Sequence, residues 1–124
     1  MDYKMLEEKL LLVSHRMLTV DTQGQQEKFP VSLLDIHAWE WPQGVGLLGL
    51  MRYYLSSKDE SVLTFLEAWY AEHLPHMDAV ERNVNSTCPM LTLTYLQEIA
   101  PKEEYMTLIR SWADWVRSPD GLIR

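Results

Sequence analysis

The sequence is poor in cysteine, in basic residues and in long apolar runs. Cys88 is the one cysteine among 124 residues, so no internal disulfide forms and a reducing compartment is favoured. The 11 Lys and Arg are outnumbered by 18 Asp and Glu, and this net charge of -7 argues against nucleic acids or anionic membranes as partners. No stretch approaches the roughly 20 apolar residues that cross a bilayer. Because the N-terminal residues also lack a secretory signal pattern, we expect a cytoplasmic protein.

The apolar residues that are present follow helical spacing. They recur at intervals of three and four over residues 3–19 and 43–56, and again in three later segments. Residues 21–36, which contain Gly24 and Pro30, are expected to form a long connection. No alternating pattern typical of strands competes. The sequence therefore predicts an all-α fold of stacked antiparallel helical hairpins.

Capping and turn signals give the expected helix boundaries. Ser57-Lys58-Asp59-Glu60 fits a capping box with Ser57 as the N-cap, and the helix that it opens is expected to stop at Leu74-Pro75. Pro89 is predicted to begin the next helix, with Cys88 at the cap position. Pro101 is predicted to open the last helix.

An internal repeat relates two parts of the chain. Residues 62–69 match residues 105–112 in their apolar positions and in a final tryptophan, at an offset of 43 residues. A period near this length, with two helices in each unit, is typical of stacked helical hairpins. Equivalent connections lie at the same end of such a stack. We therefore expect the connections at 39–44 and 82–87 to meet at one rim.

The two connections carry side chains that suit a sugar ring. Tryptophan offers a large flat apolar face, and amide side chains supply hydrogen bonds to the polar edge of a sugar. The candidate substrate-binding residues are Trp39, Trp41, Gln43, Asn83 and Asn85. An alternative stays open, in which the tryptophans only close the top of the core and the nearby glycines only permit close helix packing.

Three segments resemble a known family of enzymes. Residues 39–50 (WEWPQGVGLLGL), 83–91 (NVNSTCPML) and 112–115 (WADW) are similar to the unsaturated rhamnogalacturonyl hydrolases of glycoside hydrolase family 105. The resemblance extends from about residue 36 onward. It implies an (α/α)6 barrel, or α/α toroid, of six helical hairpins.

The resemblance also implies a reaction. Members of the family remove a terminal 4,5-unsaturated uronic acid from rhamnogalacturonan or pectin oligosaccharides. An aspartic acid protonates the double bond and then activates water, so the step is a hydration and differs from displacement at the anomeric carbon. The expected partner is an oligosaccharide with a terminal unsaturated uronic acid, and the expected process is pectin degradation.

The chain also departs from the family pattern. Family members are roughly three times as long, the size expected for twelve helices. Residues 1–124 are therefore expected to be a single all-α domain that forms the N-terminal part of an incomplete barrel, as a truncated frame, a fragment or one part of a split gene. The catalytic aspartate of the family follows the matched part, so no catalytic residue is assigned and the isolated chain is predicted to be inactive. Its uncovered last hairpin predicts self-association or a missing C-terminal part.

Acid catalysis, metal binding, a nucleotide cofactor and a reactive thiol have weaker support in the sequence. Glu40 is the one carboxylate in the aromatic block, and a salt bridge or a capping role is favoured over general acid catalysis. His73 and His76 form a His-x-x-His pair, but a metal site needs three or four converging ligands, so no metal is predicted. The Gly-x-Gly-x-x-Gly pattern at 44–49 follows no strand, which excludes a dinucleotide cofactor, and no cofactor is predicted. Cys88 is expected to be inert.

A function of another class remains as the alternative. Stacked helical hairpins commonly bind a protein or a peptide along a concave face. On this hypothesis the chain is a helical-repeat scaffold. Substitutions in the rim connections would then matter little, and changes on the helix faces would abolish binding.

Overall fold

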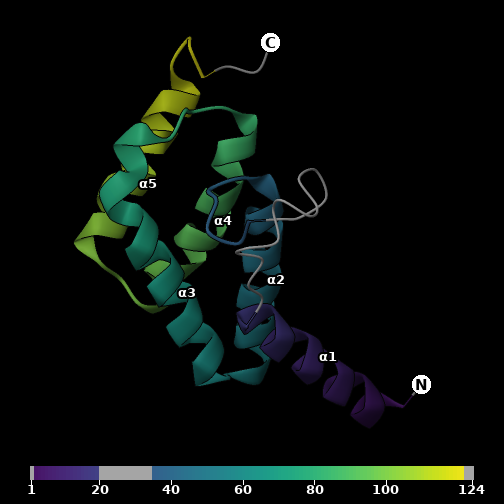
Figure 1. Ribbon diagram of the computed structural model, residues 1–124. Coiled ribbons are helices and arrows are strands. Elements are labelled where there is room, and N and C mark those ends of the chain that lie inside the picture. The colour runs from purple at the N-terminus through teal and green to yellow at the C-terminus, as the bar shows by residue number, and fades with distance from the viewer. Residues whose placement is uncertain (1, 20–34, 122–124) are drawn as a thin grey trace.

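The computed structural model describes residues 2–19 and 35–121, and within them all regular elements are helices and none is a strand (Figure 1). The elements are α1 (Tyr3–Leu18), α2 (Trp41–Ser57), α3 (Glu60–His73), the 3-10 helix η1 (Leu74–Ala79), α4 (Val84–Ile99) and α5 (Glu103–Arg117). The predicted all-α fold is confirmed. The expected connection at 21–36 lies outside the described residues except for its last two. Among the helices in the described ranges, none combines the length and apolar composition needed to span a bilayer.

The repeat organises these helices into two equivalent hairpins. The first residues of α2 and α4 are 43 positions apart, and so are the first residues of α3 and α5. Helix α2 packs along α4, and each packs on the helix that follows it, so α2–α3 and α4–α5 stack side by side. Helix α1 contacts α2 and α3 through its C-terminal part and extends away from the other helices (Figure 1).

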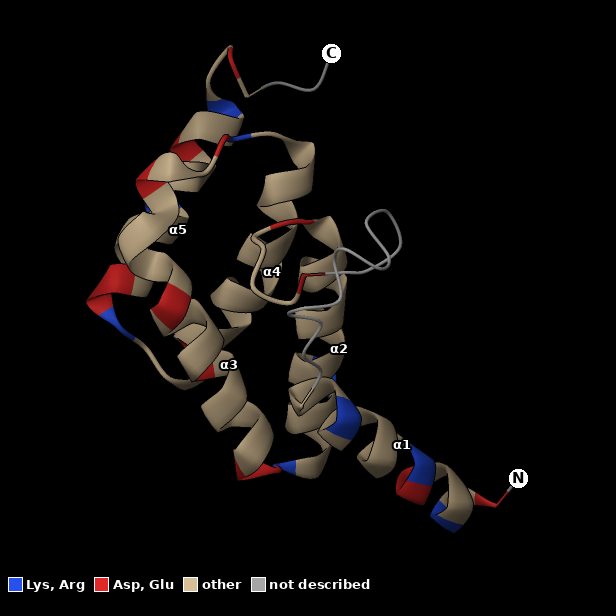
Figure 2. Ribbon diagram, viewed as in Figure 1, with Lys and Arg blue, Asp and Glu red and all other residues tan. Residues whose placement is uncertain are grey.

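The two stacked hairpins form two layers of different composition. Helices α2 and α4 carry one charged residue each, Arg52 and Glu98, whereas α3 and α5 carry several (Figure 2). The core lies between the layers, and its most deeply buried side chains include Leu47, Met51, Leu66, Tyr70, Leu93, Leu96, Tyr105 and Trp112. A helix that is apolar on most sides is normally covered on most sides. The layer formed by α2 and α4 is thus the one expected to lie inside a larger assembly.

The start of α3 differs from the prediction. Ser57 is the last residue of α2, and Lys58 ends that helix in the left-handed region with φ of 58°. Asp59 is the N-cap, and its side chain accepts a hydrogen bond from the Ser61 backbone N–H at 3.1 Å. The predicted capping box with Ser57 as N-cap is therefore wrong. The end of the helix at Leu74-Pro75 is confirmed, because α3 passes there into η1.

The starts of α4 and α5 also differ. Asn83 and Ser86 form a reciprocal capping box in which Ser86 N–H donates to Asn83 Oδ1 at 3.0 Å and Asn83 N–H donates to Ser86 Oγ at 2.9 Å. This box starts α4 five residues before Pro89, which lies inside the helix and leaves the Asn85 carbonyl without its usual N–H donor. Cys88 is consequently a helical residue and not a cap. Helix α5 begins at Glu103, two residues after Pro101.

Helices α2 and α4 approach one another closely at Gly44. A Cβ atom on this residue would lie 2.7 Å from Cys88 Sγ and 2.8 Å from the backbone nitrogen of Pro89. Gly44 is the fourth residue of α2 and Cys88 the fifth of α4, so the N-termini of the two helices lie at the same end. Trp39 Nε1 donates to the Ser86 carbonyl at 2.7 Å and joins the two connections there. The predicted meeting of the two connections is confirmed.

This contact generates a stability prediction. Gly44→Ala forces the α4 backbone away and is expected to lower the free energy of unfolding by about 1–3 kcal/mol. A Cβ atom on Gly49, in the same helix, would have nothing within 4 Å. The control Gly49→Ala is therefore expected to raise stability by up to about 1 kcal/mol, because alanine favours the helix. Urea denaturation followed by circular dichroism measures both, and equal effects of the two variants would contradict the close contact.

Candidate functional site

Trp39 belongs to an aromatic cluster at the end of the core. Its ring stacks on Trp69 with centroids 5.4 Å apart, and the ring of Tyr70 lies edge-on at 5.8 Å. The Trp112 ring completes the cluster at 6.5 Å. The side chain of Trp39 is 6% exposed and its N–H is bound to Ser86. Trp39 therefore links the two rim connections from within the core, and neither face of its ring is open to a sugar.

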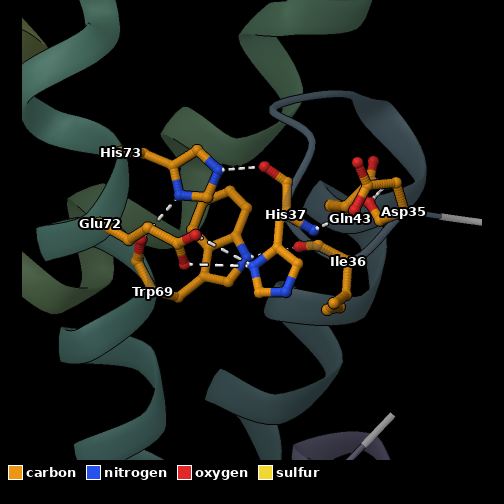
Figure 3. Close-up of polar contacts among 7 residues, drawn as sticks. All are labelled: Asp35, Ile36, His37, Gln43, Trp69, Glu72 and His73. Carbon is orange, nitrogen blue, oxygen red and sulfur yellow. Dashed lines mark hydrogen bonds and ion pairs between the residues drawn. The ribbon is translucent and has the colours of Figure 1, made fainter. Parts of the chain in front are cut away.

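The segment before α2 is held by side chains of α2 and α3 (Figure 3). Three successive carbonyl oxygens accept their hydrogen bonds: Asp35 from Gln43 Nε2, Ile36 from Trp69 Nε1 at 2.8 Å, and His37 from His73 Nε2 at 2.6 Å. The His37 ring also contacts the Glu72 carboxylate, with Nδ1 and Oε1 3.0 Å apart. The path of the chain into α2 is thus determined mainly by the last two turns of α3.

His73 has an unusual pair of partners in this arrangement. Its Nε2 faces the His37 carbonyl and its Nδ1 faces the Trp69 carbonyl at 2.8 Å. Both bonds form together only when the ring carries two protons, because each carbonyl oxygen needs an N–H donor. The ring stacks on Trp69 with centroids 3.9 Å apart.

In the second hairpin, the connection before α4 is also held by contacts with the helix that follows, but through different residues. Arg82 occupies the position equivalent to Trp39, and its guanidinium lies 5.3 Å from the centre of the Trp112 ring. Its Nη2 donates to Ser111 Oγ at 2.7 Å. Sequence reasoning missed the roles of Arg82 and His73. The available signal was the repeat offset itself, which aligns Arg82 with Trp39, and the spacing of Trp69 and His73 on one helix face.

The five predicted binding residues divide into supporting and exposed positions. Gln43 is buried, binds Asp35, and leaves its Oε1 without a partner among the described residues. Asn83 uses its side-chain oxygen to cap α4. Trp41 is 54% exposed, and Asn85 is also exposed. Only these last two present their side chains to solvent at the rim.

The N-termini of α2 and α4 give this rim a local positive character. Both helices start here, and the exposed N–H groups of a helix start carry about half a positive charge. The backbone N–H groups of Asn85 and Ser86 are taken by Asn83. Glu40 occupies the N-cap position of α2 but makes no side-chain capping bond, in contrast to the capping role favoured by the sequence. The first backbone N–H groups of α2 therefore receive no side-chain capping bond, whereas those of α4 do.

Metal and thiol chemistry have no geometric support at the predicted places. Among residues 2–19 and 35–121, no three His, Cys, Asp or Glu side chains are grouped so that they could hold a metal ion. His73 has both ring nitrogens directed at carbonyl oxygens, so it is not available as a ligand with His76. Burial raises the pKa of the Cys88 thiol, which lowers its thiolate fraction at neutral pH.

Comparison with known proteins identifies the family. The sequence model described as Glycosyl Hydrolase Family 88 matches residues 13–120. The chain belongs to this family. A solved structure described as a possible member of the GH105 family from Klebsiella pneumoniae subsp. pneumoniae MGH 78578 is 27% identical, with a TM-score of 0.77. No curated protein matches the chain.

The match to this structural relative also shows how much of the relative's fold the chain contains. The match covers 96% of this chain and 32% of the relative, so the chain spans about a third of that protein. The predicted resemblance to family 105 and the predicted part of an (α/α)6 toroid are both confirmed. The activity and substrate of a whole enzyme of this family are accordingly taken up as a proposal for this chain.

The different burial of the two rim tryptophans generates a second prediction. Trp39→Ala empties a buried site and breaks the bond to Ser86, so it is expected to lower the free energy of unfolding by about 3–5 kcal/mol. Trp41→Ala, two residues away, is expected to change stability by less than about 0.5 kcal/mol. Chemical denaturation of the two variants in parallel measures this contrast. A large loss for Trp41→Ala would show that it too supports the core.

Proposed function

We propose that residues 1–124 are a single all-α domain, the N-terminal part of a glycoside hydrolase barrel, and form one wall of its substrate cleft. The proposed substrate is a rhamnogalacturonan or pectin oligosaccharide with a terminal 4,5-unsaturated uronic acid, removed by hydration in the cytoplasm. The observation that carries the proposal is the exposure of Trp41 and Asn85 at one rim, on equivalent parallel helices of a family 88 chain.

Trp41 supplies the platform for the sugar. It is the first residue of α2, and the indole is exposed while the backbone beneath it is fixed by the bonds to residues 35–37. A rigid aromatic face binds the C–H face of a sugar without a large entropic cost. Asn85 adds an amide for the polar edge of the ring. Trp39, Gln43 and Asn83 are assigned a supporting role, because each is already engaged in the structure.

The two helix N-termini at this rim, and not the charged side chains around it, favour an anionic sugar, because the exposed carboxylates of Asp35 and Glu40 lie nearby. Although the chain has a net charge of -7, the layer formed by α2 and α4 carries only Arg52 and Glu98 (Figure 2). The uronic acid carboxylate would face the two helix N-termini, where negative charge is stabilised. At the start of α2 no side chain caps the backbone N–H groups, and the exposed Glu40 carboxylate would have to turn away from a bound uronic acid.

Proton transfer is assigned to another part of the protein. Among the described residues, the carboxylates near the rim include those of Asp35, Glu40 and Glu81, and all three are exposed. Asp35 accepts a hydrogen bond from the His37 backbone N–H at 2.9 Å. A general acid is usually shielded from bulk water beside the atom that it protonates, and these exposed carboxylates are not shielded. We therefore propose that the isolated chain binds the sugar and does not hydrolyse it.

A protein- or peptide-binding scaffold is the second candidate. The observation that favours it is a line of exposed apolar side chains along α4, which includes Leu91, Tyr95 and Ile99. The two candidates differ in the location of their binding determinants. Sugar binding depends on the rim at Trp41, whereas scaffold binding depends on the length of the α4 face.

The proposed binding role of Trp41 is tested by titration. An oligosaccharide with a terminal unsaturated galacturonic acid is expected to bind the chain in calorimetry or in NMR titration. Trp41→Ala is expected to weaken binding roughly 3- to 10-fold, since a stacking platform is lost. Tyr3→Ala is the matched control, because Tyr3 is an exposed aromatic residue at the far end of α1. Absence of binding, or equal weakening by both variants, would overturn the proposal.

The absence of catalysis is tested separately. The purified chain is expected to leave the ultraviolet absorbance of the substrate double bond unchanged over hours. Mass spectrometry of the mixture should show no released unsaturated sugar. Turnover above a denatured-protein control would show that the described carboxylates suffice for the reaction.

A further inference from the structure

The first turn of α2 has little support from its own sequence. Within the described ranges its N-cap residue, Glu40, makes no side-chain capping bond, and the first four N–H groups of a helix have no acceptor inside it. Helix ends of this kind fray unless other contacts hold them. Trp41 is the first residue of this turn. The orientation of its exposed indole therefore depends on how the chain that enters α2 is held.

The chain that enters α2 is bound at two successive carbonyl groups by side chains of α3. The His37 carbonyl accepts from His73 Nε2 at 2.6 Å, and the Ile36 carbonyl accepts from Trp69 Nε1 at 2.8 Å. The other ring nitrogen of His73, Nδ1, lies 2.8 Å from the Trp69 carbonyl oxygen. His73 thus stands between the turn of α3 that carries it and the segment before α2 (Figure 3).

The two contacts of the His73 ring depend on its protonation. With two protons the ring donates to both carbonyl oxygens. With one proton, either tautomer keeps one of these bonds and directs the lone pair of its other nitrogen at a carbonyl oxygen 2.6 or 2.8 Å away. The neutral ring must therefore turn away from one carbonyl. This turn either breaks the bond to the His37 carbonyl or moves the donor that makes it.

Several groups act on the charge of this ring. Burial opposes a charge, whereas the carbonyl groups at the end of α3, where His73 is the last residue, favour one. Among the described residues no carboxylate forms an ion pair with His73, and the nearby His37 and Glu72 pair with each other at 3.0 Å. The other titratable groups on the neighbouring elements are the exposed Asp35, Glu40, His76, Asp78 and Asp114, and Arg52 and Glu98 far along α2 and α4.

We propose that His73 is a positioning residue for the sugar platform and that it acts as an imidazolium. The inference rests on the proposed function, because Trp41 is the platform that it positions. The doubly protonated ring holds the His37 carbonyl against α3, which orders the first turn of α2 and presents the Trp41 indole in one orientation. An ordered platform binds a sugar at a lower entropic cost. The affinity for the sugar therefore falls as rising pH removes the second proton.

The hold on the entering segment is tested without sugar. NMR spectra of the histidine ring nitrogens show at which pH His73 carries two protons. Hydrogen exchange of the Trp69 indole N–H, corrected for the intrinsic effect of pH, reports whether the Ile36 carbonyl is still bound. Its protection is expected to fall roughly 3- to 10-fold as His73 loses a proton, since one hydrogen bond is lost or weakened. In His73→Gln, which offers an amide donor but does not titrate, the protection is expected to stay constant with pH.

Sugar titration on both sides of the measured His73 titration tests the positioning role. The affinity for an oligosaccharide with a terminal unsaturated galacturonic acid is expected to fall roughly 2- to 5-fold at the higher pH. His37→Asn, which removes the ring that pairs with Glu72 but keeps the backbone carbonyl, is the matched control and should retain this fall. His73→Gln should abolish it. Binding with the same pH dependence in His73→Gln, or a His73 ring with one proton wherever the chain is folded, overturns the role of His73, whereas absence of sugar binding at both pH values overturns the proposed function itself.

Discussion

The close approach of α2 and α4 at Gly44 is the constraint on which the rest of the structure depends. With no side chain at this position, the N-terminal parts of the two helices lie side by side, and Trp39 can reach the Ser86 carbonyl. That bond buries Trp39 among Trp69 and Trp112, and Trp69 in turn binds the segment before α2. The rim is thus a consequence of helix packing. Its exposed residues are held by contacts below them, which is what a preorganised binding surface requires.

The fold was predictable from the sequence because its signals are periodic. Helical spacing and the 43-residue offset depend on many positions at once, so single irregularities do not obscure them. The N-cap residues were less predictable, because several residues that are able to cap a helix are close together in the sequence. Asp59 and not Ser57 caps α3 because Lys58 first turns the chain through the left-handed region. Asn83 starts α4 before Pro89 because Ser86 returns its bond, a reciprocal contact that outweighs the proline signal.

The location of the candidate site could be predicted from the sequence, but the burial of its individual side chains could not. Trp39 and Trp41 are separated by one residue, yet one is buried and the other exposed. The difference arises because Trp39 precedes the extended N-cap residue Glu40 while Trp41 is already helical, and because the partners of Trp39 come from α3, α4 and α5. No local pattern contains those partners. The same holds for His73, whose two carbonyl acceptors become neighbours only when the segment before α2 folds over α3.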